Sequence, residues 1–173
     1  RGAARELGRH VERVCEQTGY EQVSVVGHSL GGLISRYYVQ RLGGDKRVDT
    51  LITLGTPHAG TVAAHLLPLP LIRQLRPSSS LMRELALPAT CRTRFVAIWS
   101  DRDEIVLPNR SARLEHPGLD VTPIKVHGVG HLALLGDREV VVTVIGALST
   151  RAAAASPPRS EQAPVGLDEQ ANS

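Results

Sequence analysis

The chain has 173 residues, and its 20 basic and 17 acidic side chains give a formal net charge of +3. The basic residues are scattered, which argues against nucleic-acid binding, and no apolar run reaches the roughly 18 residues that cross a bilayer. The two cysteines lack a C-x-x-C spacing, so the sequence offers neither a disulfide framework nor a metal site, and we expect no cofactor.

A helix is predicted first, because apolar residues recur at helical spacing from Leu7 to Cys15. An apolar run, Val23 to Val26, then predicts a buried strand. A second helix is predicted from Gly32 onward, with an apolar face that includes Leu33 and Tyr37. Four polar residues of this helix are expected elsewhere on the helical wheel: Ser35, Arg36, Gln40 and Arg41.

The turn between this strand and this helix reads Gly27-His28-Ser29-Leu30-Gly31. A strand, a sharp turn and a helix form the context of a nucleophile elbow, in which glycines let the backbone bend and the serine hydroxyl is held out at the end of a sheet. Ser29 is therefore the candidate nucleophile.

A serine hydroxyl needs a base, and the base needs an orienting carboxylate. A strand predicted at Phe95 to Trp99 runs into a loop with Asp101 and Asp103, and a strand predicted at Val121 to Val126 runs into a loop with two histidines, His127 and His131. Catalytic groups gather at the carboxyl ends of strands in an open α/β sheet. On residue type alone, either acid and either histidine remains a candidate.

The chain resembles α/β-hydrolases of the bacterial lipase and esterase type in four segments. They are Gly27-His28-Ser29-Leu30-Gly31-Gly32, the strand and loop from Leu51 to Thr61, Asp103-x-x-Val106-x-Pro108, and Gly130-His131. The resemblance implies an α/β fold with a mostly parallel sheet and flanking helices. The earlier strands of that fold have no counterpart here, so we expect the chain to be the C-terminal part of a longer protein, or a truncated one.

The same resemblance assigns the roles. Ser29 would attack an acyl carbonyl, His131 would take its proton, and Asp103 would orient the imidazole, because the family pattern places the acid three residues before a valine and five before a proline. The Gly-His placement before an apolar helix-like run favours His131 over His127.

Three further residues receive expected roles at the site. The backbone N–H of Leu30 would be one oxyanion donor, and the second donor would normally lie upstream of the elbow. His28 would support the serine loop, and His58 is expected to line the acyl pocket. We carry over no calcium site, because Ala133 and Leu134 follow the histidine.

We expect one partial hydrolase domain over residues 1–150, with a possible cap at 61–90, where the sequence is apolar and interrupted by prolines. A core helix with connecting loops is the alternative for that segment. Residues 151–173 lack apolar periodicity and are predicted to be a disordered tail. Any targeting segment would lie upstream of residue 1, so the compartment, cytoplasmic or secreted, and the oligomeric state stay open.

The predicted function is that of a serine hydrolase that cleaves carboxylic esters, lipid or other acyl esters, through an acyl-enzyme at Ser29. Two alternatives remain open. One is an acyltransferase or thioesterase with the same triad, and the other is an inactive fragment that keeps the triad without a complete oxyanion hole.

Overall fold

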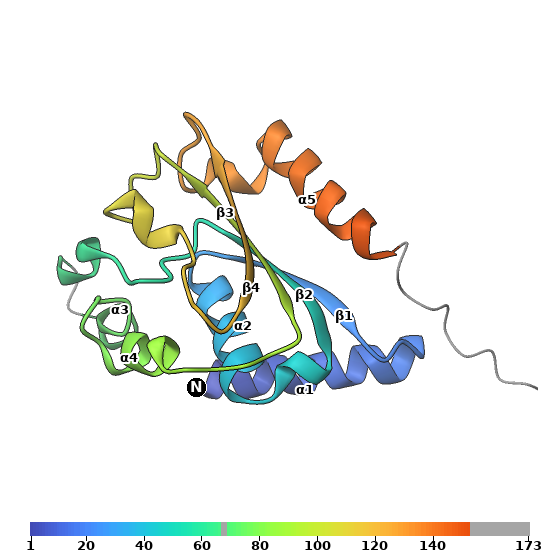
Figure 1. Ribbon diagram of the computed structural model, residues 1–173. Coiled ribbons are helices and arrows are strands. Elements are labelled where there is room, and N and C mark those ends of the chain that lie inside the picture. The colour runs from blue at the N-terminus through green and yellow to red at the C-terminus, as the bar shows by residue number, and fades with distance from the viewer. Residues whose placement is uncertain (67–68, 153–173) are drawn as a thin grey trace, which may run out of the picture.

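The computed structural model describes residues 1–66 and 69–152, and its centre is a four-stranded parallel sheet (Figure 1). The strands are β1 (Val23–His28), β2 (Val48–Leu54), β3 (Arg94–Ser100) and β4 (Asp120–Val126), and they lie side by side in chain order. Each pair is parallel. All four carboxyl ends therefore meet at one edge, and the predicted α/β class with a parallel sheet is confirmed.

Helices cover both faces of this sheet, as strand alternation requires. In β3, Phe95 and Ala97 pack into the core that includes α1 (Gly2–Thr18) and α2 (Leu30–Arg41), whereas Val96 and Ile98 pack on the other face. That second face is covered by α5 (Arg138–Ala152). In Figure 1, α1 and α2 lie on one side of the sheet and α5 lies on the other.

The strands differ in burial according to their place in the sheet. The central strands β2 and β3 are almost entirely buried. In the described sheet β4 pairs with β3 alone, and this edge strand carries Pro123, a residue that lacks a backbone N–H donor. At the opposite edge β1 pairs with β2 alone, and Val26 of β1 is 47% exposed.

The polar residues of α2 do not all face solvent, although the sequence pattern places them away from the apolar face of the helix. Ser35, Arg36 and Gln40 are all buried. A short helix, α4 (Ser80–Ala86), packs beside α2, and its Leu85 carbonyl accepts hydrogen bonds from both Arg36 and Gln40, each at 2.9 Å. The sequence periodicity of α2 could not reveal this contact, because it involves a segment more than 40 residues away.

The described residues of the segment predicted to be a cap contain two short helices besides α4. They are the 3-10 helix Val62–His65 and α3 (Pro70–Arg73). Leu85 and Met82 of α4 are buried in the same core as α1 and α2, so this part of the segment is a core helix. A cap formed by the rest stays a prediction.

The C-terminal helix α5 continues to Ala152, two residues into the segment expected to be a tail. Residues 153–173, the rest of that predicted tail, lie outside the described residues. No helix in the described part of the chain is long and apolar enough to cross a membrane.

Candidate active site

The elbow lies between β1 and α2, where the chain makes the sharp turn that the glycine pattern predicts. Ser29 has φ 54° and is the one non-glycine residue of the described ranges with a positive φ. Such a conformation costs on the order of 1–3 kcal/mol and persists only where the surroundings impose it. The surroundings here are tight, because a Cβ added to Gly27 would lie 2.7 Å from the Cα of Gly32.

The elbow is also packed against the loop that follows β2. A Cβ added to Gly32 would lie 1.9 Å from Oγ1 of Thr56. Gly27 is therefore required by the close approach of the Gly32 backbone, and Gly32 is required by the Thr56 side chain that packs against it. The Ser29 side chain is partly exposed and makes no capping hydrogen bond to α2.

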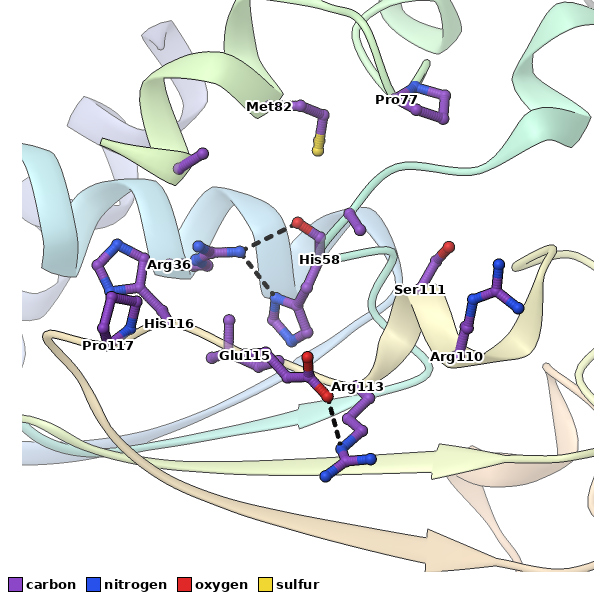
Figure 2. Close-up of a pocket in the computed structure, with 13 residues that line it drawn as sticks. Arg36, His58, Pro77, Met82, Arg110, Ser111, Arg113, Glu115, His116 and Pro117 are labelled. Carbon is purple, nitrogen blue, oxygen red and sulfur yellow. Dashed lines mark hydrogen bonds and ion pairs between the residues drawn. The ribbon is translucent and has the colours of Figure 1, made fainter. Parts of the chain in front are cut away.

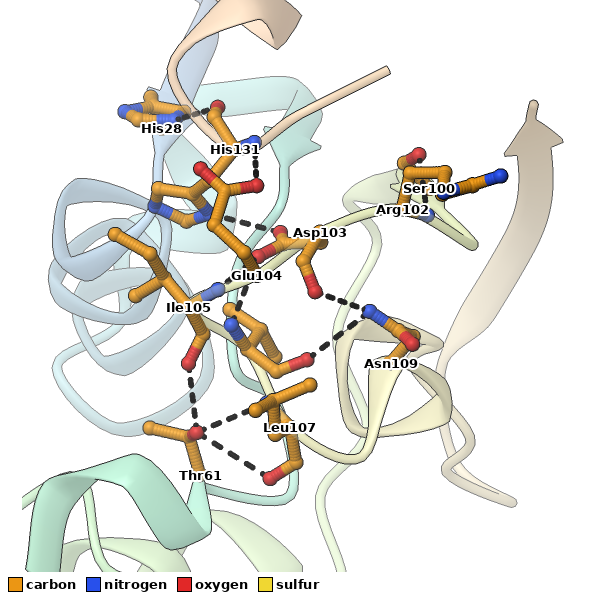
Figure 3. A network of polar contacts seen from close by, with 11 residues as sticks. His28, Thr61, Ser100, Arg102, Asp103, Glu104, Ile105, Leu107, Asn109 and His131 are labelled. Atoms are coloured by element: carbon orange, nitrogen blue, oxygen red, sulfur yellow. Dashed lines mark hydrogen bonds and ion pairs between the residues drawn. The ribbon is translucent and has the colours of Figure 1, made fainter. Parts of the chain in front are cut away.

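The loops after β3 and β4 bring Asp103 and His131 together. Nδ1 of His131 lies 2.7 Å from Oδ2 of Asp103, and the two side chains are 3% and 1% exposed (Figure 3). A carboxylate oxygen is an acceptor, so the proton of this bond lies on Nδ1 and a neutral ring keeps Nε2 free to accept another proton. This is the arrangement that a serine hydrolase uses to orient its base.

The Asp103 carboxylate is held as an anion by its neighbours. Its Oδ1 accepts hydrogen bonds from the backbone N–H groups of Ile105, at 2.9 Å, and Val106, at 2.8 Å. Burial acts to raise the pKa of Asp103, but the hydrogen bonds from His131, Val106 and Ile105 outweigh it, and the pKa is lowered overall. The carboxylate therefore stays ionised at neutral pH.

Two residues hold the main chain of His131. The His131 N–H donates to Oε2 of Glu104 at 3.0 Å, and its carbonyl accepts from Nε2 of His28 at 3.0 Å. The rings of His28 and His131 lie 4.7 Å apart between centroids. His28 directly precedes Ser29, so this contact places the imidazole of His131 beside the elbow.

Gly55, directly after β2, lies against the Asp103–His131 pair. Its φ is 52°, and an added Cβ would lie 3.0 Å from Oδ2 of Asp103 and 3.2 Å from Nδ1 of His131. The Gly55-Thr56-Pro57 sequence belongs to the segment from Leu51 to Thr61 that resembles lipases. No sequence pattern predicts that Gly55 packs on the buried pair. None predicts the contact of Glu104 with His131.

The rival acid and the rival histidine also pair, but at the surface. Nδ1 of His127 lies 2.7 Å from Oδ2 of Asp101, which also contacts Lys125 at 3.2 Å. The His127 side chain is 72% exposed and that of Asp101 is 36% exposed. The structure thus separates the four candidates into a buried pair and an exposed pair.

Leu30 and His58 occupy different surroundings. Leu30 is the first residue of α2, where helix N–H groups have no acceptor within the helix. His58 follows β2 and is buried, with Nε2 3.0 Å from Oγ1 of Thr53 and Nδ1 3.5 Å from Nη1 of Arg36. Burial, aided by the charge of Arg36, holds the pKa of His58 well below its usual range. Whether either residue meets a substrate stays a prediction.

In the ranges that the structure describes, no three histidine, cysteine, aspartate or glutamate residues lie in an arrangement that could hold a metal ion. The two cysteines of the chain, Cys15 and Cys91, are free.

The parallel sheet, the elbow at the end of β1 and the buried acid–histidine pair define an α/β-hydrolase of the lipase and esterase type, as the sequence resemblance predicted. The model of the palmitoyl protein thioesterase family matches residues 2–91, which is more than half of the chain. The chain therefore belongs to that family.

Two curated proteins are similar to part of the chain. The triacylglycerol lipases of Pseudarthrobacter phenanthrenivorans and Burkholderia plantarii are each 38% identical to it over 60 residues, which is 35% of this chain. The match covers 18% of the first protein and 16% of the second. The chain thus spans a small part of the length of these relatives.

Solved structures match over most of the chain. The lipase BlEst2 of Bacillus licheniformis in its mature form gives a TM-score of 0.66 at 16% identity, covering 84% of this chain and 72% of that structure. Lipase B of Aspergillus fumigatus gives 0.65 at 20% identity, with 86% and 42% covered. The lin2722 gene product of Listeria innocua gives 0.62 at 23% identity, with 85% and 65% covered. These likenesses establish the fold.

Proposed function

We propose that the protein is a serine hydrolase that cleaves carboxylic esters of acyl chains, with Ser29 as nucleophile, His131 as base and Asp103 as the carboxylate that orients it. The observation that carries the proposal is the buried 2.7 Å contact between His131 and Asp103, at the edge of the sheet where the strained Ser29 directly follows β1. The named lipases among the relatives support an ester as the substrate.

In this mechanism Ser29 Oγ attacks the acyl carbonyl while Nε2 of His131 takes its proton. The Leu30 N–H stabilises the oxyanion that develops, and such a donor is worth roughly 3 to 4 kcal/mol. His131 then protonates the departing alcohol, which leaves an acyl group on Ser29. Water, activated by His131, releases the acid and restores the serine.

A thioester is the second candidate substrate class, and the family match to palmitoyl protein thioesterases over residues 2–91 favours it. The same serine, base and carboxylate would act, and only the leaving group would change from an alcohol to a thiol. A pair of substrates with the same acyl chain, one an oxygen ester and one a thioester, separates the two candidates by their kcat/KM values.

The test of the nucleophile is covalent labelling with a fluorophosphonate, followed by intact-mass analysis of folded protein. Wild type should gain one adduct, and Ser29→Ala should gain none. Ser24→Ala is the matched control, since Ser24 lies on β1, the strand that leads to Ser29, and its hydroxyl donates to Asp49. This variant should label like wild type. An unlabelled, folded wild-type chain would instead support the inactive-fragment alternative.

A further inference from the structure

A cavity of about 560 Å³ lies beside α2, apart from the elbow (Figure 2). Its walls come from α2, α4, the loop after β2 and the segment 110–117. None of Ser29, Asp103 and His131 lines it. The volume falls within the roughly 300–1,000 Å³ that is typical of small-molecule sites.

The inner wall of this cavity carries a buried cation. Arg36 is 3% exposed, and no described carboxylate forms an ion pair with it. Its guanidinium donates to neutral acceptors: the carbonyls of His58, at 3.1 Å, and Leu85, at 2.9 Å, and the side-chain oxygen of Gln40, at 3.0 Å. Burial, with the charge of Arg41, lowers the pKa of Arg36 to about 10.

These bonds satisfy most of the guanidinium donors but leave its charge uncompensated by any described anion. A buried charge without a counter-ion is expensive, and an anion beside it would offset that cost. His58 contacts Arg36 and also lines the cavity, and its lowered pKa keeps it neutral at neutral pH, so it supplies no counter-ion to the guanidinium.

The outer wall is basic as well. Arg110 and Arg113 line the cavity from the segment after β3, and Arg110 forms no ion pair with a described residue. Arg113 pairs with Glu115 at 3.0 Å, and Glu115 is the one acidic residue among those that line the cavity. Three arginines against one glutamate give the described walls an excess of positive charge.

Most of the remaining lining is apolar. The apolar residues are Ala59, Pro77, Met82, Ala86, Leu114 and Pro117, and Ser111 and His116 complete the walls. A free inorganic anion would meet the arginines but leave these side chains in contact with water. An organic anion with an aliphatic body would satisfy both kinds of wall at once, because burial of its carbon chain adds a favourable hydrophobic contribution.

We propose that this cavity is a second binding site, separate from the triad, for a carboxylate that carries a short aliphatic chain. The carboxylate would lie toward the arginines and the chain along Met82 and Leu114. Two sources share this chemistry: the acid released by ester cleavage at Ser29, and an acid from elsewhere that acts as an effector. The site itself does not depend on the proposed function, since its residues are distinct from the triad.

The experiment is titration calorimetry with octanoate, using octanol as the uncharged analogue and inorganic phosphate as the anion without a chain. Octanoate should bind wild type with a single site, and both controls should bind at least tenfold more weakly. The double variant Arg110→Gln/Arg113→Gln should weaken octanoate binding by at least tenfold. Arg13→Gln, an exposed arginine on α1 away from the cavity, is the matched control and should bind like wild type.

The two outer arginines are exposed, so their replacement leaves the core intact, and thermal unfolding verifies the fold of each variant. Equal binding by the double variant and wild type would overturn the proposal. Loss of octanoate binding after fluorophosphonate labelling of Ser29 would also overturn it, since the acid would then occupy the catalytic site. Absence of labelling would count against the proposed function alone.

The two sources are separated by ester turnover in the presence of octanoate. If the acid is a regulator, octanoate changes the turnover of an ester with a different acyl chain in wild type but not in the double variant. If the site holds only the released product, the double variant loses inhibition by the product acid of the ester being cleaved and no other acid has an effect. Either result supports the site.

Discussion

Two aspartate–histidine pairs lie at the same edge of the sheet, each with 2.7 Å between Nδ1 and a carboxylate oxygen. The pair of Asp103 and His131 is almost wholly buried, and both partners are held by further hydrogen bonds to their surroundings. The pair of Asp101 and His127 is exposed, and its carboxylate is shared with Lys125. Distance alone therefore does not distinguish a base-orienting pair from a surface ion pair, whereas burial and the contacts around each partner do.

The largest expected effect is the loss of catalytic activity in the Asp103→Asn variant. An amide in place of the carboxylate favours the wrong imidazole tautomer, and we expect kcat/KM for an acyl ester to fall by roughly 10³ to 10⁴. Asp101→Asn is the matched control, and its kcat/KM should stay within about threefold of wild type, because exposed pairs contribute little. Equal losses in the two variants would remove the distinction between the pairs.

The next effect tests whether Gly55 leaves room for the buried pair. Gly55→Ala would place a methyl 2.7 Å from Cδ1 of Leu134 and close to both Asp103 and His131, so we expect kcat/KM to fall by roughly 10- to 100-fold. Gly43→Ala is the control, because Gly43 also has a positive φ but no atom lies within 4 Å of the added Cβ. Both variants should lose stability, measured by thermal unfolding, and Gly55→Ala alone should lose activity.

A smaller effect is expected from the contact between Glu104 and the His131 N–H. Glu104→Gln keeps an oxygen acceptor, and its kcat should remain within about threefold of wild type, whereas Glu104→Ala should lower kcat by roughly tenfold through a looser histidine loop. KM should change little in both, because the contact does not reach the substrate. Identical kcat values for the two variants would show that the acceptor oxygen has no positioning role.

The smallest effect concerns acid stability. The pKa of Asp103 is lowered from 3.8 by its hydrogen bonds, and that of Asp101 is lowered mainly by the Gly128 N–H and Lys125. A carboxylate with a lowered pKa stabilises the fold above its ordinary pKa and loses that contribution as the pH falls through the lowered value. Denaturant unfolding between about pH 5 and pH 2 should therefore show a shallower loss of stability in Asp103→Asn and in Asp101→Asn than in wild type. Curves parallel to that of wild type would contradict the assignment.

Local sequence patterns were sufficient to predict three of the four described strands and the elbow, whereas β2 was expected only from the family resemblance, from Leu51 onward, and begins at Val48. The apolar runs at Val23, Phe95 and Val121 each begin a strand within two residues of the expected position. α2 begins at Leu30 rather than at Gly32, directly after the turn at Ser29. These features depend on neighbouring residues, so they can be inferred without tertiary contacts.

The contacts around the site could not be inferred in this way, because they join segments that are distant in the sequence. Glu104 and His131 are 27 residues apart, and His28 and His131 are 103 residues apart. The burial of Arg36 likewise depends on Leu85 of α4. A helical wheel places Arg36 away from the apolar face, and only the packing of α4 on α2 shows that this cation is enclosed.

The order of the strands across the sheet determines when, during synthesis of the chain, the proposed catalytic residues can come together. The described strands follow one another across the sheet in the order in which the ribosome makes them. Ser29, the proposed nucleophile, directly follows the first of them, and His131, the proposed base, follows the last. Chains emerge and fold from the N-terminus. On the proposed mechanism, a nascent chain displays Ser29 long before its histidine has been translated. Until β4 docks, Ser29 has no base to take its proton, so the growing polypeptide does not react with cellular acyl groups. Premature termination before that strand yields an inactive product.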